Sequence, residues 1–186
     1  MIRPATQEKY SELVDFAESI RLNEFNSLPI RDGLDMLHGV CASTQWGQLM
    51  LAARPFSDID DVLRHADRIL TELPVAEIDA ARDAHARIGD SVDNASEARE
   101  QAGVADATRS VRERLAEGNR AYEEKFGYIY LVFATGKTGE EMATILTDRL
   151  HNDPETERRV MISELGKINR LRLQQLLAEP IAEGSS

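Results

Sequence analysis

The chain has 186 residues and carries 33 Asp and Glu against 22 Lys and Arg, which gives a formal charge of −11. This length predicts one domain, and 42% apolar with 30% charged residues is typical of a globular protein without a membrane span. The negative charge argues against nucleic acid and anionic membranes as partners, because phosphate groups repel such a chain.

Apolar residues at helical spacing predict helices over 6–22, 30–41 and 58–73, with proline-containing breaks between them. Asp58 is a predicted N-cap of the third helix, since its side chain can accept a hydrogen bond from the first helical turn. Few aromatic and β-branched residues interrupt these stretches, and therefore the sequence favours an all-α fold.

The segment 85–103 has poor helical periodicity and many turn-forming residues, which predicts a polar loop between two helical blocks. Regular apolar spacing then predicts a long helix from Val104 to about Phe126. The apolar run 128–134 favours a buried extended segment, although its periodicity does not exclude a buried helix.

Two helix starts are marked near the C-terminus. Thr138 and Glu141 fit a capping box that opens a helix to about residue 150, and Asp153-Pro154 predicts the start of a last helix to about residue 178. We therefore expect an all-α, single compact domain of about eight helices over residues 1–186, with its core at about 22–178.

Candidate chemistry is concentrated in the predicted loop. His85 is followed by Glu97, Glu100 and Gln101, and a histidine beside a carboxylate is the simplest apparatus for proton transfer near neutral pH. The amide of Gln101 both donates and accepts, which suits a urea or amide group on a ligand. A solvated loop histidine remains the alternative interpretation. The other histidines have no metal-ligand spacing, and the single cysteine, Cys41, excludes a cysteine-rich zinc site.

A local excess of cations lies between residues 158 and 172, a stretch that contains five Lys and Arg and a single acidic residue, Glu164. Arg172 lies seven residues after Leu165 and four after Ile168, at the inward-facing positions of the predicted last helix. An inward arginine needs an anionic partner, which is either a substrate carboxylate or an internal Asp or Glu.

At this point the sequence resembles a known family. The ordered segments that carry the resemblance are Phe25–Pro29, Trp46, Ala53–Phe56, Ala66-Asp67, His85–Gly89, Glu100–Gly103, Asn119–Gly127, Ala134–Lys137, Arg149–Asn152 and Lys167–Leu173. In this order and spacing they are similar to the 2-oxo-4-hydroxy-4-carboxy-5-ureidoimidazoline (OHCU) decarboxylase family, which forms (S)-allantoin at the end of urate degradation.

The resemblance implies an all-α, cofactor-free and metal-free decarboxylase that acts as a homodimer in the cytoplasm on a small ureidoimidazoline. It assigns catalytic roles to His85 and Glu100. Substrate-binding roles are implied for Gln101, for Arg172 and for main-chain groups of the buried segment, namely Tyr130, Leu131, Val132, Phe133 and Ala134.

Two positions depart from the family pattern, and both are expected to border the substrate. Ala86 stands where the family usually has a proline, which would fix the backbone after His85. Glu97 stands where the family often has a serine, and a carboxylate there would repel an anionic substrate. These departures leave two alternatives open: a cofactor-free lyase or isomerase on a related ureido acid, and a non-catalytic helical paralogue that binds a metabolite or partner.

Overall fold

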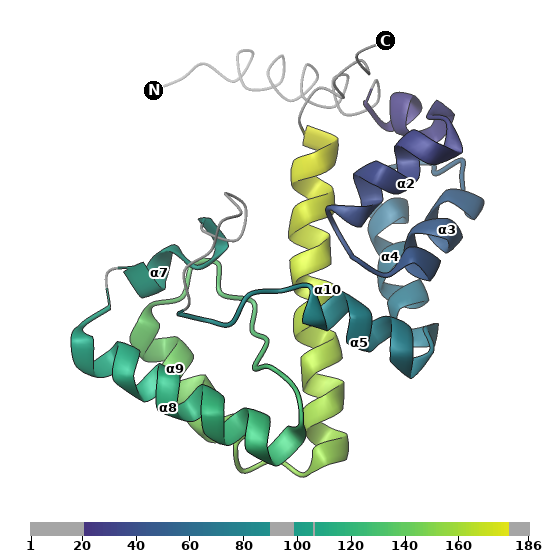
Figure 1. Cartoon of the computed structure of the whole chain (residues 1–186). Helices are drawn as coiled ribbons and strands as arrows, with labels where there is room; N and C mark the ends of the chain where they lie inside the picture. The colour runs from purple at the N-terminus through teal and green to yellow at the C-terminus, as the bar shows by residue number, and fades with distance from the viewer. Residues whose placement is uncertain (1–20, 90–98, 106, 179–186) are drawn as a thin grey trace, which may run out of the picture. The chain divides into compact units, whose positions relative to one another are not determined.

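A computed structural model describes residues 21–89, 99–105 and 107–178 (Figure 1). These residues form helices and connecting segments without a strand, which confirms the all-α prediction. The chain packs as two compact units. One contains the described residues up to Leu73 and those from Asn169 onward, and the other is Pro74–Ile168.

The first unit contains α2 (Ile30–His38), α3 (Thr44–Ala52), α4 (Ile59–Glu72) and the end of α10 (Pro154–Ala178). α3 packs against both α2 and α4. Trp46 is fully buried and donates from Nε1 to the Ala66 carbonyl at 3.2 Å. Asp58 caps α4 as predicted, because its carboxylate accepts from the Asp61 N–H at 2.7 Å.

The second unit contains α5 (Val75–Asp83), α7 (Ala102–Ala105), α8 (Arg109–Phe126), α9 (Gly139–Arg149) and α10 up to Ile168. α8 packs against α9 around a core that includes Leu115, Met142 and Leu146. The predicted capping box at the start of α9 is present in full: the Thr138 side chain accepts from the Glu141 N–H, and the Glu141 carboxylate accepts from the Thr138 N–H.

The predicted long helix from Val104 is wrong at its start. Val104 lies in the short α7, and α8 begins only at Arg109 because the Thr108 hydroxyl caps it by accepting from the Val111 N–H at 3.4 Å. The periodicity of the apolar residues continues across this break, which is why the spacing alone did not reveal it.

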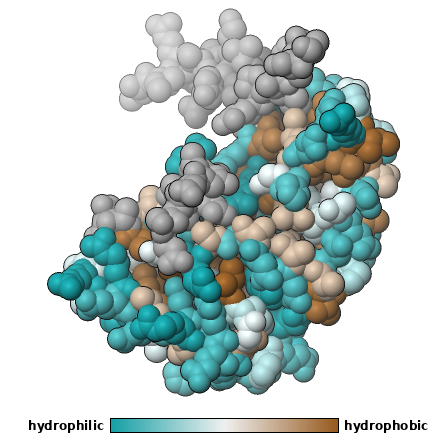
Figure 2. Space-filling model, in the orientation of Figure 1, coloured by the Kyte–Doolittle hydropathy of each residue, from teal (hydrophilic) through white to brown (hydrophobic). Residues whose placement is uncertain are grey.

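The run 128–134 is neither helix nor strand, and Tyr130, Leu131, Val132 and Ala134 are all buried. The burial agrees with the preferred prediction of a buried extended segment, and the alternative of a buried helix is wrong. The face shown in Figure 2 is mostly hydrophilic, in keeping with the high charged content. Across the described residues, no helix is both long and apolar enough to cross a membrane.

Candidate active site

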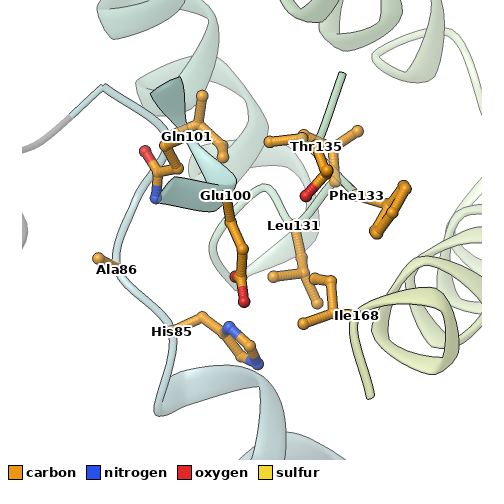
Figure 3. Close-up of a pocket in the computed structure, with 11 residues that line it drawn as sticks. His85, Ala86, Glu100, Gln101, Leu131, Phe133, Thr135 and Ile168 are labelled. Carbon is orange, nitrogen blue, oxygen red and sulfur yellow. The ribbon is translucent and has the colours of Figure 1, made fainter. Parts of the chain in front are cut away.

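A pocket in the unit Pro74–Ile168 brings together the loop after α5, the residues before α7 and the buried segment after α8 (Figure 3). The space between its walls amounts to about 320 Å³, including the opening to solvent. The residues that line it are His85, Ala86, Ile88, Glu100, Gln101, Leu131, Val132, Phe133, Ala134, Thr135 and Ile168.

His85 and Glu100 form one side of this pocket. His85 lies just beyond the end of α5, where its main-chain N–H donates to the Arg82 carbonyl at 3.0 Å. Its side chain is half-buried. The carboxylate of Glu100, also half-buried, points toward the His85 imidazole (Figure 3). Such a pair can move a proton to or from a ligand atom in the pocket.

Contacts with α8 anchor the segment that carries His85. Arg87 donates two hydrogen bonds to the Glu123 carboxylate, at 2.5 Å from Nε and 2.9 Å from Nη2. These bonds hold the pKa of Glu123 below its ordinary value. One residue further, the Ile88 carbonyl accepts from Nδ2 of the buried Asn119 at 2.9 Å. The backbone directly after His85 is therefore fixed by both a side-chain pair and a main-chain contact.

Gln101 lies on the same wall as Glu100. Its Oε1 accepts from the Gly89 N–H at 3.2 Å, which links the start of α7 to the His85 loop. Its Nε2 has no hydrogen-bond partner among the described residues, so this donor is available to a ligand. In Figure 3 the amide lies beside the loop that carries Ala86.

The opposite wall is the main chain of the segment 131–134, which one buried arginine helps to hold. Arg149, at the end of α9, donates from Nη1 to the Leu131 carbonyl at 2.7 Å. The same guanidinium bonds Oε1 of Glu157 at 2.8 Å from Nε and 2.5 Å from Nη2. Both side chains are buried, at 6% and 0% exposed respectively.

Two further side chains complete this buried network. The hydroxyl of Tyr122 contacts Glu157, and Asn152 donates from Nδ2 to the other Glu157 oxygen at 2.7 Å. Burial and the bond to Glu157 raise the pKa of Tyr122, so the phenol keeps its proton. Burial by itself would lower the pKa of Arg149, but the bond to Glu157 and the electrostatic interactions with Tyr122, Glu157 and Tyr130 together outweigh it and raise the pKa.

The structure places the predicted site residues in three groups. The pocket is lined by His85, Ala86, Glu100, Gln101 and the residues Leu131, Val132, Phe133 and Ala134. The Tyr130 side chain is buried away from this lining, and its hydroxyl donates to the Met142 carbonyl at 3.3 Å. Arg172 belongs to the other compact unit, and Glu97 lies outside the described residues.

Three lining residues, Ile88, Thr135 and Ile168, were not identified as candidates from the sequence. Thr135 directly follows the predicted buried segment, and its hydroxyl is turned toward the pocket interior in Figure 3. Ile168 was predicted to face inward on the last helix, but only the fold shows that it faces the site. The spacing of apolar residues predicted that Ile168 is buried, but it did not predict which residues surround it.

The cation-rich stretch of α10 is largely paired with carboxylates. Arg158 pairs with Asp79 at 3.4 Å, Arg159 with Glu155 at 2.5 Å, Arg170 with Asp67 at 2.6 Å, and Lys167 with Glu164. Most of this local positive charge is therefore neutralised within each unit. Among the described residues no group of three His, Cys, Asp or Glu side chains is arranged to hold a metal ion.

Comparison with known proteins agrees with this geometry. The family model described as OHCU decarboxylase matches residues 26–174. A crystal structure of an OHCU decarboxylase in the presence of (S)-allantoin is 27% identical with a TM-score of 0.69, covering 76% of this chain and 96% of that one. A crystal structure of an (S)-allantoin synthase, 19% identical with a TM-score of 0.65 over 83% of this chain and 53% of that chain, shares the fold.

Curated relatives include two kinds of protein. The 2-oxo-4-hydroxy-4-carboxy-5-ureidoimidazoline decarboxylase of Amia calva is 28% identical over 76% of this chain and 82% of its own length. The uric acid degradation bifunctional proteins of Bacillus sp. (strain TB-90) and Arabidopsis thaliana are 25% and 28% identical, and the chain spans only 33% and 45% of their lengths. Because the family model covers most of the sequence, the chain belongs to the OHCU decarboxylase family.

Proposed function

We propose that the chain is a carboxy-lyase that converts 2-oxo-4-hydroxy-4-carboxy-5-ureidoimidazoline to (S)-allantoin in urate degradation. The observation that carries the proposal is the pocket in which His85 and Glu100 face main-chain groups of residues 131–134, in a chain of this family. The curated relatives of matching length, including the one from Amia calva, bear the name of this decarboxylase.

The substrate supplies its own electron sink, so the reaction needs no added cofactor. The carbon that carries the carboxylate lies next to a ring C=N bond. When the bond to carbon dioxide breaks, its electron pair forms a C=C bond to the neighbouring carbon, and the C=N pair moves to the ring nitrogen, which takes up a proton. The 4-hydroxyl then loses a proton while the neighbouring carbon gains one. The protein has to orient the carboxylate and place one acid–base group on a single face of the ring.

In this proposal His85 moves the proton at the 4-hydroxyl or the reacting carbon, and Glu100 orients the imidazole. The Nε2 donor of Gln101 and the main chain of residues 131–134 bind the ureido and ring amide groups. The family resemblance further implies that Arg172, which does not line this pocket, binds an anionic or carbonyl oxygen of the substrate. Protonation from one face gives a single enantiomer, whereas unaided decarboxylation of the free substrate gives racemic allantoin.

The deciding experiment is a circular dichroism time course on substrate generated in situ from urate. The wild-type chain should produce optically active allantoin. His85→Ala should give the racemate, because general acid–base groups contribute about 10²–10⁴-fold to rate. His151→Ala is the matched control, since this exposed histidine of the same unit lies outside the pocket. Optically active product from His85→Ala at the wild-type rate would refute its assignment.

We also propose that the protein acts as a cytoplasmic homodimer on a small molecule, without nucleic acid or a membrane as partner. The dimer and the location follow from the family resemblance, and the charge of −11 disfavours polyanionic partners. Light scattering coupled to size exclusion would test the dimer. A single species with the mass of one chain at micromolar concentration would refute it.

A further inference from the structure

Three side chains hold the main chain of the pocket wall at two alternate residues. The Leu131 carbonyl accepts from Arg149 at 2.7 Å. The Phe133 N–H donates to Oε2 of Glu164 at 2.7 Å, and the Phe133 carbonyl accepts from Nζ of Lys137 at 2.6 Å. Side chains thus take the place that a neighbouring strand would occupy in a sheet.

Val132, between these two residues, differs from them in its main-chain hydrogen bonding. Its N–H and its carbonyl have no hydrogen-bond partner among the described residues, although Val132 is only 3% exposed and lines the pocket. Buried main-chain groups are nearly always paired, so an unpaired donor and acceptor in a pocket wall point to a ligand. A donor beside an acceptor on one residue matches the N–H and C=O of a urea or amide group.

Glu164 lies where it can set the direction of these groups. It is on α10, one turn before the lining residue Ile168, and its side chain is 11% exposed. Its second oxygen pairs with Lys167, which offsets the carboxylate charge beside a site for an anion. The Val132 carbonyl and the Phe133 N–H belong to the same peptide group. By accepting from this N–H, Glu164 fixes the plane of the peptide and with it the direction of the Val132 carbonyl.

We propose that Glu164, together with Lys137 and Arg149, is a positioning residue that orients the Val132 main chain for recognition of the ureido group. This inference rests on the proposed function, and it concerns side chains that act through the backbone and do not touch the substrate. It predicts that the hydrogen bond accepted by Glu164 matters more than its charge.

Two substitutions at one position separate these effects. Glu164→Gln keeps an oxygen acceptor and removes the charge, whereas Glu164→Ala removes both. We expect kcat/KM to fall about tenfold in Glu164→Ala, through a higher KM, and to stay within about threefold of wild type in Glu164→Gln. The affinity for (S)-allantoin, measured by calorimetry, should fall in parallel. Glu113→Ala, which removes an exposed ion pair with Arg109, is the control and should change neither quantity.

A second variant and a direct readout keep the test decisive. Lys137→Met removes the donor to the Phe133 carbonyl from a half-exposed side chain, so it remains measurable if Glu164→Ala does not fold. We expect its KM to rise as well. In the wild type, (S)-allantoin should slow hydrogen exchange of the Val132 amide by at least about tenfold.

The outcomes distinguish the two proposals. A wild-type chain without turnover refutes the proposed function, and the inference with it. If the wild type is active, equal losses in Glu164→Ala and Glu164→Gln would show a charge effect and refute the inference alone. An unchanged KM in both Glu164→Ala and Lys137→Met, or a Val132 amide that (S)-allantoin leaves unprotected, would also refute it.

Discussion

Replacing Arg149 by Met should strongly destabilise the unit Pro74–Ile168. The change removes the Nε and Nη2 bonds to Glu157, at 2.8 and 2.5 Å, and the bond to the Leu131 carbonyl at 2.7 Å. Glu157 is fully buried, so its charge would remain in the interior without a counter-ion. Removing one member of a buried pair costs about 3–5 kcal/mol, and we expect Arg149→Met to lie in that range.

Urea unfolding followed by circular dichroism measures this loss by linear extrapolation. Arg109→Met is the matched control, because Arg109 and Glu113 form a pair whose side chains are 91% and 63% exposed. Exposed pairs contribute about 0–1 kcal/mol, so the control should stay close to wild type.

A double variant isolates the cause. If the loss comes from an unpaired buried charge, Arg149→Met combined with Glu157→Gln should be less destabilised than the sum of the two single variants. Glutamine at position 157 keeps one side-chain oxygen, so it can accept from only one of Tyr122 and Asn152, which donate to different oxygens of Glu157. A loss below about 1 kcal/mol in Arg149→Met, or strict additivity in the double variant, would refute this account of the network.

Two further predictions concern local geometry. The pKa of Glu141 is lowered, chiefly by the Thr138 N–H, so its contribution to stability is complete above the ordinary value of 4.5 and is lost as the pH falls through the lower folded value. Thermal unfolding of Glu141→Gln should therefore approach that of the wild type as the pH falls from about 5 to 2, and a gap independent of pH would contradict this. In Gly103→Ala the new Cβ would lie 1.9 Å from the Lys137 carbonyl oxygen, which should cost about 1–3 kcal/mol, while Gly39→Ala, whose nearest atom is at 3.4 Å, should cost less.

The parts of the fold that the sequence predicted well depend on local signals. Asp58 caps α4, and the Thr138–Glu141 box opens α9, because a cap and its partner lie within one helical turn. The break before α8 was missed because the periodic spacing of apolar residues passes through Thr108 without interruption. Its capping role depends on where the chain turns, which periodicity does not encode.

The site divides in the same way. His85, Glu100 and Gln101 were identified from one loop, and they line one pocket. The role of Arg149 was not found, although it begins one of the segments that carry the family resemblance. Its partner carbonyl at Leu131 is 18 residues away in the sequence, and no spacing rule links a helix end to a main-chain oxygen at that separation.

The absence of a proline after His85 acquires a physical meaning from the contacts of the following residues. Proline would fix the backbone dihedral at position 86, whereas Ala86 leaves it free. In this chain Arg87 and Glu123 join the next residue to α8 by two hydrogen bonds, and Ile88 is buried with its carbonyl bound to Asn119. Because these contacts lie within three residues of His85, they restrict the backbone between His85 and Ile88 from its C-terminal end. The position of the imidazole therefore depends on tertiary contacts with α8, where the usual family sequence would rely on the stiffness of the chain itself.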